Sequence, residues 1–183
     1  MFRTDDILFA TLFTNRLQLR PLTITDCEAI FGVRSNDFVN QYLDRPACIT
    51  SEDALLFIKN IQQDIIKQKC MYWAICFNRN NNLIGTICLF DFSADQQTAE
   101  IGFELLPPFQ GKGYMQEALA AILTLGFEVL KIQTISAVAH IDNYPSIHLL
   151  EKNNFTRFPD AEGNTDTAYF SCTRIAFTKS LTR

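Results

Sequence analysis

The sequence predicts one α+β domain spanning residues 1–183, built around a mixed, mainly antiparallel β-sheet. The chain contains 183 residues, and 48% of them are hydrophobic, which is enough for one well-formed core. Two β-rich segments flank a turn cluster at residues 78–82, a pattern typical of an antiparallel hairpin. Segments with helical spacing lie on both sides of this hairpin, and no repeat or low-complexity linker divides the chain.

Each expected element rests on a local signal. Alternation of apolar and polar residues predicts strands, apolar residues at helical spacing predict helices, and capping residues or proline mark where a helix begins. In the first half, these signals predict a strand at 17–22, a helix capped at Thr25-Asp26, a helix from Thr50 to about Lys69, and hairpin strands at 72–77 and 83–90. In the second half, they predict a strand from Thr98 to Leu106 ended by Pro107-Pro108, a helix from about Gly113 to Lys131, a strand at 132–139, a short helix from about Pro145 to Asn153, and a strand-like tail at 168–178.

Composition and charge exclude several classes of function. The net charge is −4 and the 16 Lys and Arg residues are scattered, so no basic patch suggests nucleic-acid binding. No window approaches the roughly 20 apolar residues of a membrane span, and Asp5 and Asp6 give the N-terminus the wrong charge for a signal peptide. The six cysteines, together with His140 and His148, show no metal-ligand spacing and no C-x-x-C. We therefore expect a cytoplasmic protein with reduced thiols and no metal site.

The segment Gln110-Gly111-Lys112-Gly113-Tyr114-Met115 predicts an anion-binding turn. It lies where a strand gives way to an amphipathic helix, and two glycines within three residues let the backbone curl close to a ligand. The free N–H groups of the helix's first turn, and the helix dipole, favour a phosphate there. The P-loop pattern is missing, and Gln116 stands where a dinucleotide-binding fingerprint needs a small residue. A plain tight turn is the alternative.

A second segment, residues 143–155, begins and ends a short helix. If Pro145 is the first helical residue, Asn143 lies just outside the cap with its amide available to another partner, and Ser146 lies in the first turn. Asn154 can take the left-handed conformation that ends a helix, with Phe155 turning into the core. Local capping by Ser146 and an Asx turn at Asn143 are the alternatives.

Together, these segments resemble the GNAT acetyltransferase superfamily. Residues 110–115 look like its Q/R-x-x-G-x-G/A acetyl-CoA signature, and residues 143–155 look like its later N-x-x-S-x-x-L-x-E-K-x-G-F block. Residues 14–22 are similar to the opening T-x-R-L-x-L-R-P-L of the branch that contains the Rim-type ribosomal-protein N-acetyltransferases. Residues 83–86 and 99–103 agree further, so the resemblance runs from about Thr14 to the C-terminal strand.

The resemblance implies a layered α/β/α fold with a splayed sheet. Acetyl-CoA would lie in the gap between the strand that ends at Leu106 and the strand that starts at Ile132. Its pantetheine arm would pair with the backbone near the end of the first of these strands, its pyrophosphate would lie on the N–H groups of the glycine turn, and Asn143 would contact the cofactor arm. The implied cofactor-binding residues are Glu104, Leu105, Leu106, Gln110, Gly111, Lys112, Gly113, Tyr114, Met115, Asn143 and Ser146.

Two positions depart from the family pattern. Met115 replaces the usual final Gly or Ala, which leaves its N–H available but crowds the turn. Leu150 occupies the slot where many members carry a general-acid Tyr. Ser146 matches the position from which Rim-type enzymes are thought to protonate the leaving thiolate, so Ser146 or a water is expected to act as the acid.

The third strand supplies the candidate bases. Glu100 and Glu104 alternate onto one strand face together with Gly102, and either glutamate could take the amine proton, through water. A solvated strand face is the alternative for each. Phe31 and Trp73 could line the entrance for the acceptor or belong to the core.

The expected activity is direct transfer of an acetyl group from acetyl-CoA to a primary amine, without a covalent enzyme intermediate. An α-amino group with a pKa near ~7.8 is about a quarter neutral at pH ~7.4, whereas a lysine near ~10.4 is about 0.1% neutral. A weakly specified base therefore favours a protein or peptide N-terminal amine. A small-molecule amine, such as a polyamine or an antibiotic, is the alternative acceptor. A non-catalytic acyl-CoA-binding module is the alternative class of protein, and the departure at Leu150 favours it. The sequence leaves open whether the protein forms a homodimer.

Overall fold

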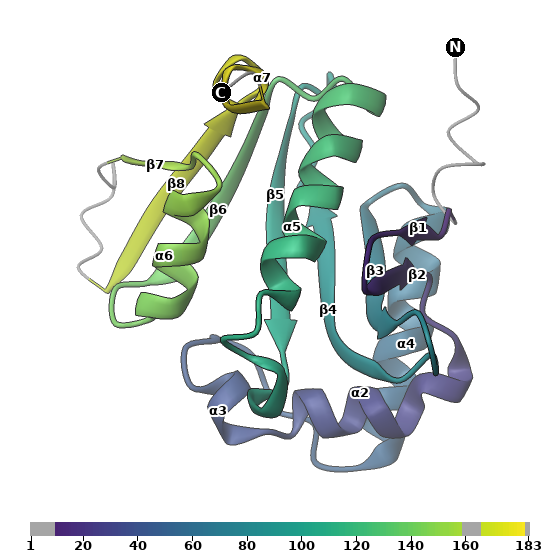
Figure 1. Cartoon of the computed structure of the whole chain (residues 1–183). Helices are drawn as coiled ribbons and strands as arrows, with labels where there is room; N and C mark the ends of the chain where they lie inside the picture. Colours follow the sequence, from purple (N-terminus) through teal and green to yellow (C-terminus); the bar gives the residue numbers. More distant parts are fainter. Residues whose placement is uncertain (1–9, 159–165, 182–183) are drawn as a thin grey trace.

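The computed structural model describes residues 10–158 and 166–181, which form an open sheet flanked by helices. Its strand order is β1-β2-β3-β4-β5-β6-β8-β7, and β5 and β6 are its parallel neighbours (Figure 1). The other neighbours are antiparallel. The expected α+β class, with a mixed and mainly antiparallel sheet, is therefore confirmed. The acidic start at Asp5 and Asp6 lies outside the described residues.

The strands and helices follow one another much as the sequence predicts. The strands are β1 (Leu12–Phe13), β2 (Leu17–Arg20), β3 (Cys70–Phe77), β4 (Leu83–Phe90), β5 (Thr98–Leu105), β6 (Thr134–His140), β7 (Thr156–Phe158) and β8 (Thr167–Thr173). The helices are η1 (Ile24–Asp26), α2 (Cys27–Arg34), α3 (Asp37–Asn40), α4 (Ser51–Ile66), η2 (Pro107–Phe109), α5 (Tyr114–Thr124), the π-helical turn η3 (Leu125–Val129), α6 (Tyr144–Lys152) and α7 (Arg174–Leu181).

Helices cover both faces of the sheet. Figure 1 shows α5 and α6 on one side and α4 on the other. Gly126 of η3 lies so close to β6 that an added Cβ would stand 2.8 Å from the side chain of Ile135, and the side chain of Leu89 lies next to it. On the opposite face, the ring of Phe57 in α4 meets the ring of Tyr72 edge-on, at 5.7 Å between centroids. The core therefore has two layers, one on each side of β3, β4 and β5.

The sheet opens between β5 and β6. These strands pair over three residues each, Thr98–Glu100 with Thr134–Ser136. Figure 1 shows them close together at this end and well apart at the other, where the N-terminal end of α5 and the helix α3 lie. The splay expected from the family resemblance is therefore present, and the remainder of β5 has an edge that β6 does not cover.

Two expected elements need correction. The predicted tail strand at 168–178 ends at Thr173, and a helix follows because the hydroxyl of Thr173 accepts a hydrogen bond from the N–H of Ala176 (3.3 Å). The ring of Phe177 then packs against that of Phe127 at 5.1 Å. The predicted long helix from Gly113 to Lys131 becomes a π-helical turn in its last part, where the N–H of Leu130 donates to the carbonyl of Leu125.

Candidate active site

A cleft of about 560 Å³ lies at the open end of the splay, between β5, α3, the N-terminal end of α5 and α6. It brings together the two chain segments that resemble the GNAT motifs. Of the residues predicted to bind the cofactor, those that line it are Glu104, Leu105, Gln110, Gly111, Gly113, Tyr114, Met115, Asn143 and Ser146. Leu106 and Lys112 do not line it.

The glycine turn has the backbone conformation of an anion cradle. Gly111 and Gly113 both have positive φ, +72° and +77°, which side chains with a Cβ rarely adopt. Gly113 is the N-cap of α5 and provides no side-chain cap, so the first N–H groups of the helix are left for a ligand. No atom lies within 4 Å of the position that a Cβ on Gly111 would take, so the turn is open on that side.

Arg16 supports this turn from the start of the chain. Its guanidinium donates to the carbonyl of Lys112 (3.0 Å) and to the carboxylate of Glu117 (2.6 Å), and it stacks over the ring of Tyr114 at 4.4 Å. Burial acts against the charge of Glu117, but hydrogen bonds from Thr14 and Arg16 outweigh it and lower the pKa of that carboxyl. The ammonium group of Lys112 is turned away, onto the carbonyl of Pro108 (2.7 Å). No spacing in the sequence links Arg16 to the glycine turn, because 96 residues separate it from Lys112.

The uncovered edge of β5 offers backbone groups to the cleft. The N–H of Leu106 donates to the carbonyl of Ile84 on β4 (2.9 Å). Because backbone groups alternate along a strand, those of Phe103 and Leu105 point away from β4 and into the gap. The carbonyl of Leu105 accepts a hydrogen bond from the side-chain amide of Gln110 (2.8 Å). Within the stretch from Glu104 to Leu106, where a ligand was expected to pair with the backbone, the groups of Leu105 face the gap, and those of Phe103 lie one alternation before them.

The N-terminus of α6 supplies the other wall. Asn143 is the N-cap itself, and its side-chain oxygen accepts a hydrogen bond from the N–H of Ser146 (3.3 Å). The expectation that Asn143 lies outside the cap is wrong, although its amide nitrogen has no partner among the described residues. The hydroxyl of Ser146 is likewise unpaired within the described part of the chain, and it lines the cleft. Asn154 has φ +65°, as expected for the residue that ends this helix.

Burial explains both residues that depart from the family pattern, Leu150 and Met115. Leu150 is 1% exposed and belongs to the hydrophobic core, so it takes no part in chemistry. Met115 is 8% exposed and lies in the first turn of α5, with its side chain packed into the core as well as along the cleft. Its bulk is therefore accommodated largely below the turn.

Glu104 is held in a buried polar network. The guanidinium of Arg45 binds both carboxylate oxygens, and that of Arg34 lies 3.8 Å from one of them. The hydroxyl of Thr86 also donates to this carboxylate (3.2 Å) and accepts in turn from the hydroxyl of Tyr72 (2.9 Å). The carboxylate of Glu104 is therefore committed to two guanidinium groups and to the hydroxyl of Thr86, which fix its side chain in the wall of the cleft.

Glu100 lies in the opposite situation on the same strand. Its side chain has no hydrogen bond or ion pair among the described residues. Burial, and then the negative charge of Asp91, raise the pKa of its carboxyl. Glu100 does not line the cleft, because it lies where β5 and β6 still pair, about 13 Å along the strand from Glu104.

The remaining candidate site residues differ in whether they line the cleft. Trp73 is fully buried, and its indole N–H donates to the carbonyl of Ala10 (3.2 Å), so its predicted place at the acceptor entrance is wrong. Phe31 packs on the core from α2 and does not line the cleft. His148 does line it, and His140 stacks on Tyr42 at 5.3 Å. Within residues 10–158 and 166–181, no three His, Cys, Asp or Glu side chains gather as a metal site would require.

Several cleft residues were not predicted. Tyr42 and its neighbours Phe38 and Leu43 line the cleft from α3 and the segment after it, and Lys152 lines it from the end of α6. Lys152 belongs to the motif at 143–155 but was given no role, whereas the other three residues carried no motif, since their place depends on how the segment between α2 and α4 folds back onto β5. Arg45 anchors that segment to Glu104. The described part of the chain contains no helix that is both long and apolar enough to cross a bilayer.

Comparison with known proteins identifies the family. The model of the acetyltransferase (GNAT) domain matches residues 16–156. The N-acetyltransferase YoaA of Bacillus subtilis is 33% identical over 150 residues, which cover 82% of this chain and 85% of that protein.

Solved structures agree with this match. An acetyltransferase of the GNAT family from Bacillus anthracis superposes with a TM-score of 0.78 at 26% identity, covering 91% of this chain and 99% of that one. The ribosomal L7/L12 alpha-N-protein acetyltransferase RimL, in complex with coenzyme A, shares the fold with a TM-score of 0.79 at 18% identity, over 90% and 98% of the two chains. The open cleft, the glycine turn and these matches lead to one conclusion: the chain belongs to the GNAT family of acetyl-CoA-dependent N-acetyltransferases.

Proposed function

We propose that this protein acetylates the N-terminal amine of a protein or peptide in the cytoplasm, by direct attack of the amine on acetyl-CoA. The observation that carries this proposal is the state of the two glutamates on β5. Glu104 forms ion pairs with Arg45 and Arg34, whereas the carboxylate of Glu100 on the same strand face has no hydrogen bond or ion pair within the described residues. A site with one weak base suits an amine that is already partly neutral.

The cleft fits acetyl-CoA as the donor. The positive-φ glycines and the uncapped start of α5 suit its pyrophosphate, and the N–H groups of Phe103 and Leu105 suit its pantetheine amides. On the α6 side of the cleft, Asn143 has an amide nitrogen without a partner among the described residues, and Lys152 has a positive charge. When bound, acetyl-CoA supplies the activated acetyl group, and each of these protein groups fixes its position without a metal ion.

The protein groups that act during transfer lie on both sides of the gap. Glu100 takes a proton from the acceptor ammonium, directly or through water. The amine nitrogen then forms a bond to the thioester carbon, and a backbone N–H on the uncovered edge of β5 stabilises the negative charge on the carbonyl oxygen. As the carbon–sulfur bond breaks, the attacking nitrogen loses its second proton, and the hydroxyl of Ser146, or a water beside it, gives a proton to the departing thiolate and is reprotonated by the one that leaves the nitrogen.

The choice of an α-amine over a lysine follows from proton affinity. At pH ~7.4 about a quarter of an α-amino group is neutral, against about 0.1% of a lysine, a difference of more than 100-fold in reactive species. Burial and Asp91 raise the pKa of Glu100 and so make it a better base, but a carboxylate is still a far weaker base than a lysine amine, so an α-amine is the easier acceptor to deprotonate. The name of the fold neighbour RimL describes acetylation of an α-amine on a protein, which supports the same acceptor class.

An acceptor panel tests this proposal. We expect free thiol to be released from acetyl-CoA in the presence of peptides with free N-termini, and little or none with polyamines or with N-terminally blocked peptides that contain lysine. Acetyl-CoA at ~100 times its Kd should also add about 2.7 kcal/mol of stability, a rise in melting temperature of roughly 5–10 °C. Turnover on lysines alone would overturn the acceptor class, and binding without turnover on any amine would favour a non-catalytic module.

A further inference from the structure

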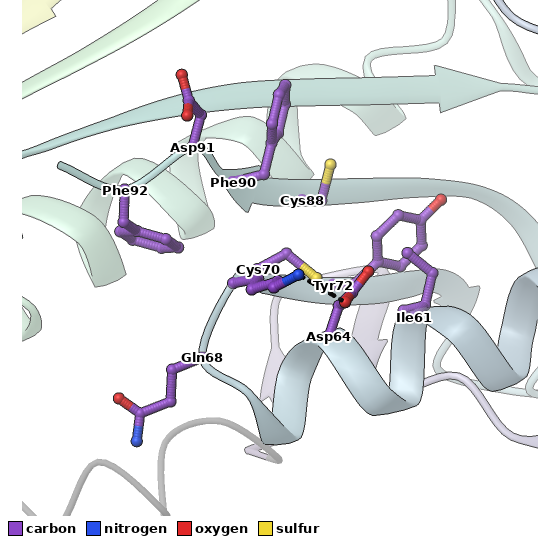
Figure 2. A pocket seen from close by; sticks show the side chains of 10 residues that line it. Ile61, Asp64, Gln68, Cys70, Tyr72, Cys88, Phe90, Asp91 and Phe92 are labelled. Carbon is purple, nitrogen blue, oxygen red and sulfur yellow. Dashed lines mark ion pairs between the residues drawn. The ribbon is translucent and has the colours of Figure 1, made fainter. Parts of the chain in front are cut away.

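A second cavity, of about 720 Å³, lies on the sheet face that α5 does not cover. Figure 2 shows side chains that line it from the C-terminal end of α4 and from the adjoining ends of β3 and β4. Leu89 faces Gly126 of η3, so alternation along β4 puts Cys88 and Phe90 on the other face, where this cavity lies. Neither the sequence motifs nor the cofactor cleft account for it.

The cavity adjoins the strand that carries the transfer chemistry. In the register of β4 and β5, Cys88 lies opposite Gly102 and Phe90 lies opposite Glu100. A Cβ on Gly102 would stand 3.3 Å from the side chains of both Cys88 and Phe90, so these two lining residues pack directly against the backbone of β5. The pairing of β5 with β6 ends at Glu100, and the backbone groups of Phe103 begin three residues, about 10 Å, further along.

The wall of the cavity is apolar and aromatic. Tyr72, Phe90, Phe92 and Ile61 contribute to it, and a cavity of this size is large enough for a drug-sized ligand or a few peptide residues. The thiol of Cys88, whose pKa burial raises to about 12, stays neutral at physiological pH. An apolar body would therefore be buried here without leaving a charged cysteine beside it.

Two carboxylates, Asp91 in the cavity lining and Glu100 opposite Phe90 on β5, have no cationic partner among the described residues. Asp91 lines the cavity, and its charge is one of those that act on Glu100. The side chains of both residues are without a hydrogen bond or ion pair in the described part of the chain. Asp64, also in the lining, is different because Lys69 lies 3.9 Å away, as the dashed line in Figure 2 marks. The backbone of Asp91 has φ +50°, a left-handed conformation that holds this carboxylate at the end of β4.

We propose that this second cavity is the acceptor pocket, and that it selects a peptide whose first residue is apolar or aromatic. The protonated N-terminal amine is received between Asp91 and Glu100, and the first side chain lies against Phe90, Phe92 and Tyr72. The acceptor thus enters from the sheet face opposite the glycine turn, and the two substrates meet at the gap between β5 and β6. This inference rests on the proposed function, because it names the acceptor of the same site.

Charge and the burial of apolar surface both favour a peptide whose first residue is apolar or aromatic. An ammonium ion between Asp91 and Glu100 relieves the repulsion between the two carboxylates, whereas an acidic first residue would add to it. An apolar first side chain removes hydrocarbon surface from water, which a glycine at that position cannot do.

The test uses calorimetric binding of peptides that differ in the first residue, Phe, Gly or Glu, measured with and without CoA. We expect the Phe peptide to bind about ten-fold more tightly than the Gly peptide, and the Glu peptide to bind most weakly. Asp91→Asn should weaken binding of the Phe peptide about five- to ten-fold, and Ile61→Trp should block the cavity and remove the preference for Phe. Glu128→Gln, the matched charge change at an exposed position outside both cavities, should have no effect.

The outcomes separate the two proposals. The affinity for CoA should stay unchanged in all variants, and melting temperatures check that Ile61→Trp is folded. If the Phe peptide binds equally well to wild type, Asp91→Asn and folded Ile61→Trp, or does not bind to wild type, the acceptor pocket is overturned. If wild type does not bind CoA, the proposed function fails instead, while peptide binding measured without CoA still decides the role of this cavity.

Discussion

At the scale of single residues, Glu100 and Glu104 show how neighbours assign different roles to one residue type. Both lie on the same face of β5, yet Glu104 faces Arg45 and Arg34 while Glu100 faces the carboxylate of Asp91. The carboxylate of Glu104 therefore has a structural role, because by binding Arg45 it holds the segment after α3 against β5. The carboxylate of Glu100 is kept unpaired and partly buried, which is the environment of a general base.

Replacing Glu100 by Gln should lower kcat about 100-fold and raise stability at neutral pH. The lower kcat follows from loss of the base. A carboxyl whose pKa is raised by folding destabilises the fold when ionised, so stability is greatest below its unfolded pKa and falls as pH rises through the folded one. Glu100→Gln removes this loss, and pH-dependent melting curves check it.

The pH dependence of catalysis gives an independent check on the same residue. Wild-type kcat should rise with pH through the raised pKa of Glu100, because the base must be deprotonated. In Glu104→Gln, kcat should still rise with pH in the same way, although this change weakens the fold. If kcat of Glu100→Gln still rose with pH as in wild type, another group would be the base.

Ser146→Ala should lower kcat by about ten-fold or more while leaving the Kd of acetyl-CoA within about two-fold. The hydroxyl of Ser146 has no partner within the described residues, so its loss disturbs no local structure, and α6 keeps its cap at Asn143. Ser51→Ala, the same change at an exposed position in α4, is the control. Single-turnover kinetics measure the effect, and an unchanged kcat would assign thiolate protonation to water alone.

The difference between the two glutamates could not be predicted from the sequence. The alternation of Glu100, Gly102 and Glu104 correctly indicates a shared strand face. Arg45, the partner of Glu104, is however 59 residues away in a segment without a motif. Arg16, which binds the glycine turn, lies 96 residues from Lys112. Alternation and spacing report on neighbours along an element, whereas a buried ion pair depends on which elements meet.

At the scale of elements, the start of α5 is the part whose function follows most directly from backbone conformation. Gly113 has φ +77° and caps the helix without a side chain, so the same residue shapes the turn and leaves the N–H groups free. Gln110 and Arg16 fix the two ends of this turn by hydrogen bonds to the carbonyls of Leu105 and Lys112.

Gly113→Val should abolish the stabilisation by acetyl-CoA. A β-branched residue in the left-handed region is strained by about 1–2 kcal/mol, so the turn would rearrange and its N–H groups would no longer converge. The matched control is Gly32→Ala in α2, where nothing lies within 4 Å of the added carbon and a gain of about 0.5–1 kcal/mol is expected. Thermal shift with acetyl-CoA is the readout; a full shift in Gly113→Val would mean that the pyrophosphate lies elsewhere.

The segment after α3 should depend on Arg45. Arg45→Met keeps the length of the side chain but removes the cation that binds Glu104, in a pair whose side chains are 19% and 10% exposed. We expect a loss of about 1–3 kcal/mol in the free energy of unfolding, less than for an isolated buried pair because Arg34 remains. Urea denaturation measures this loss. A stability equal to wild type would show that the pair does not anchor this wall.

Elements with strong periodicity were predicted well, and short or mixed ones were not. The strand Leu83–Phe90 was expected with these bounds because its residues are β-rich, and the start of the helix after Thr50 was expected because a capping box marks it, although that helix ends at Ile66 rather than near Lys69. α3 and β7 were missed, since they are four and three residues long. The tail was misassigned because apolar residues alternate through Phe177 even though a helix begins at Arg174.

At the scale of the whole molecule, the splayed sheet makes one strand the boundary between the cofactor cleft and the cavity that we propose for the acceptor. The cofactor cleft faces α5 and α6, the second cavity faces α4, and β5 lies between them with its N–H groups of Phe103 and Leu105 uncovered. The family and the cofactor cleft were accessible from the sequence, since their motifs are local. The second cavity was not, because its walls come from the ends of three elements.

The most direct test of the central claim uses two peptides of identical sequence that contain one internal lysine, one with a free N-terminus and one with it blocked. The initial rate of thiol release from acetyl-CoA is measured at a single pH near 7.4, with mass spectrometry of the product. We predict turnover on the free peptide, a single acetyl group on its N-terminal nitrogen, and a rate at least 100-fold lower on the blocked peptide. Equal rates on both peptides, with acetylation of the lysine, would contradict the account.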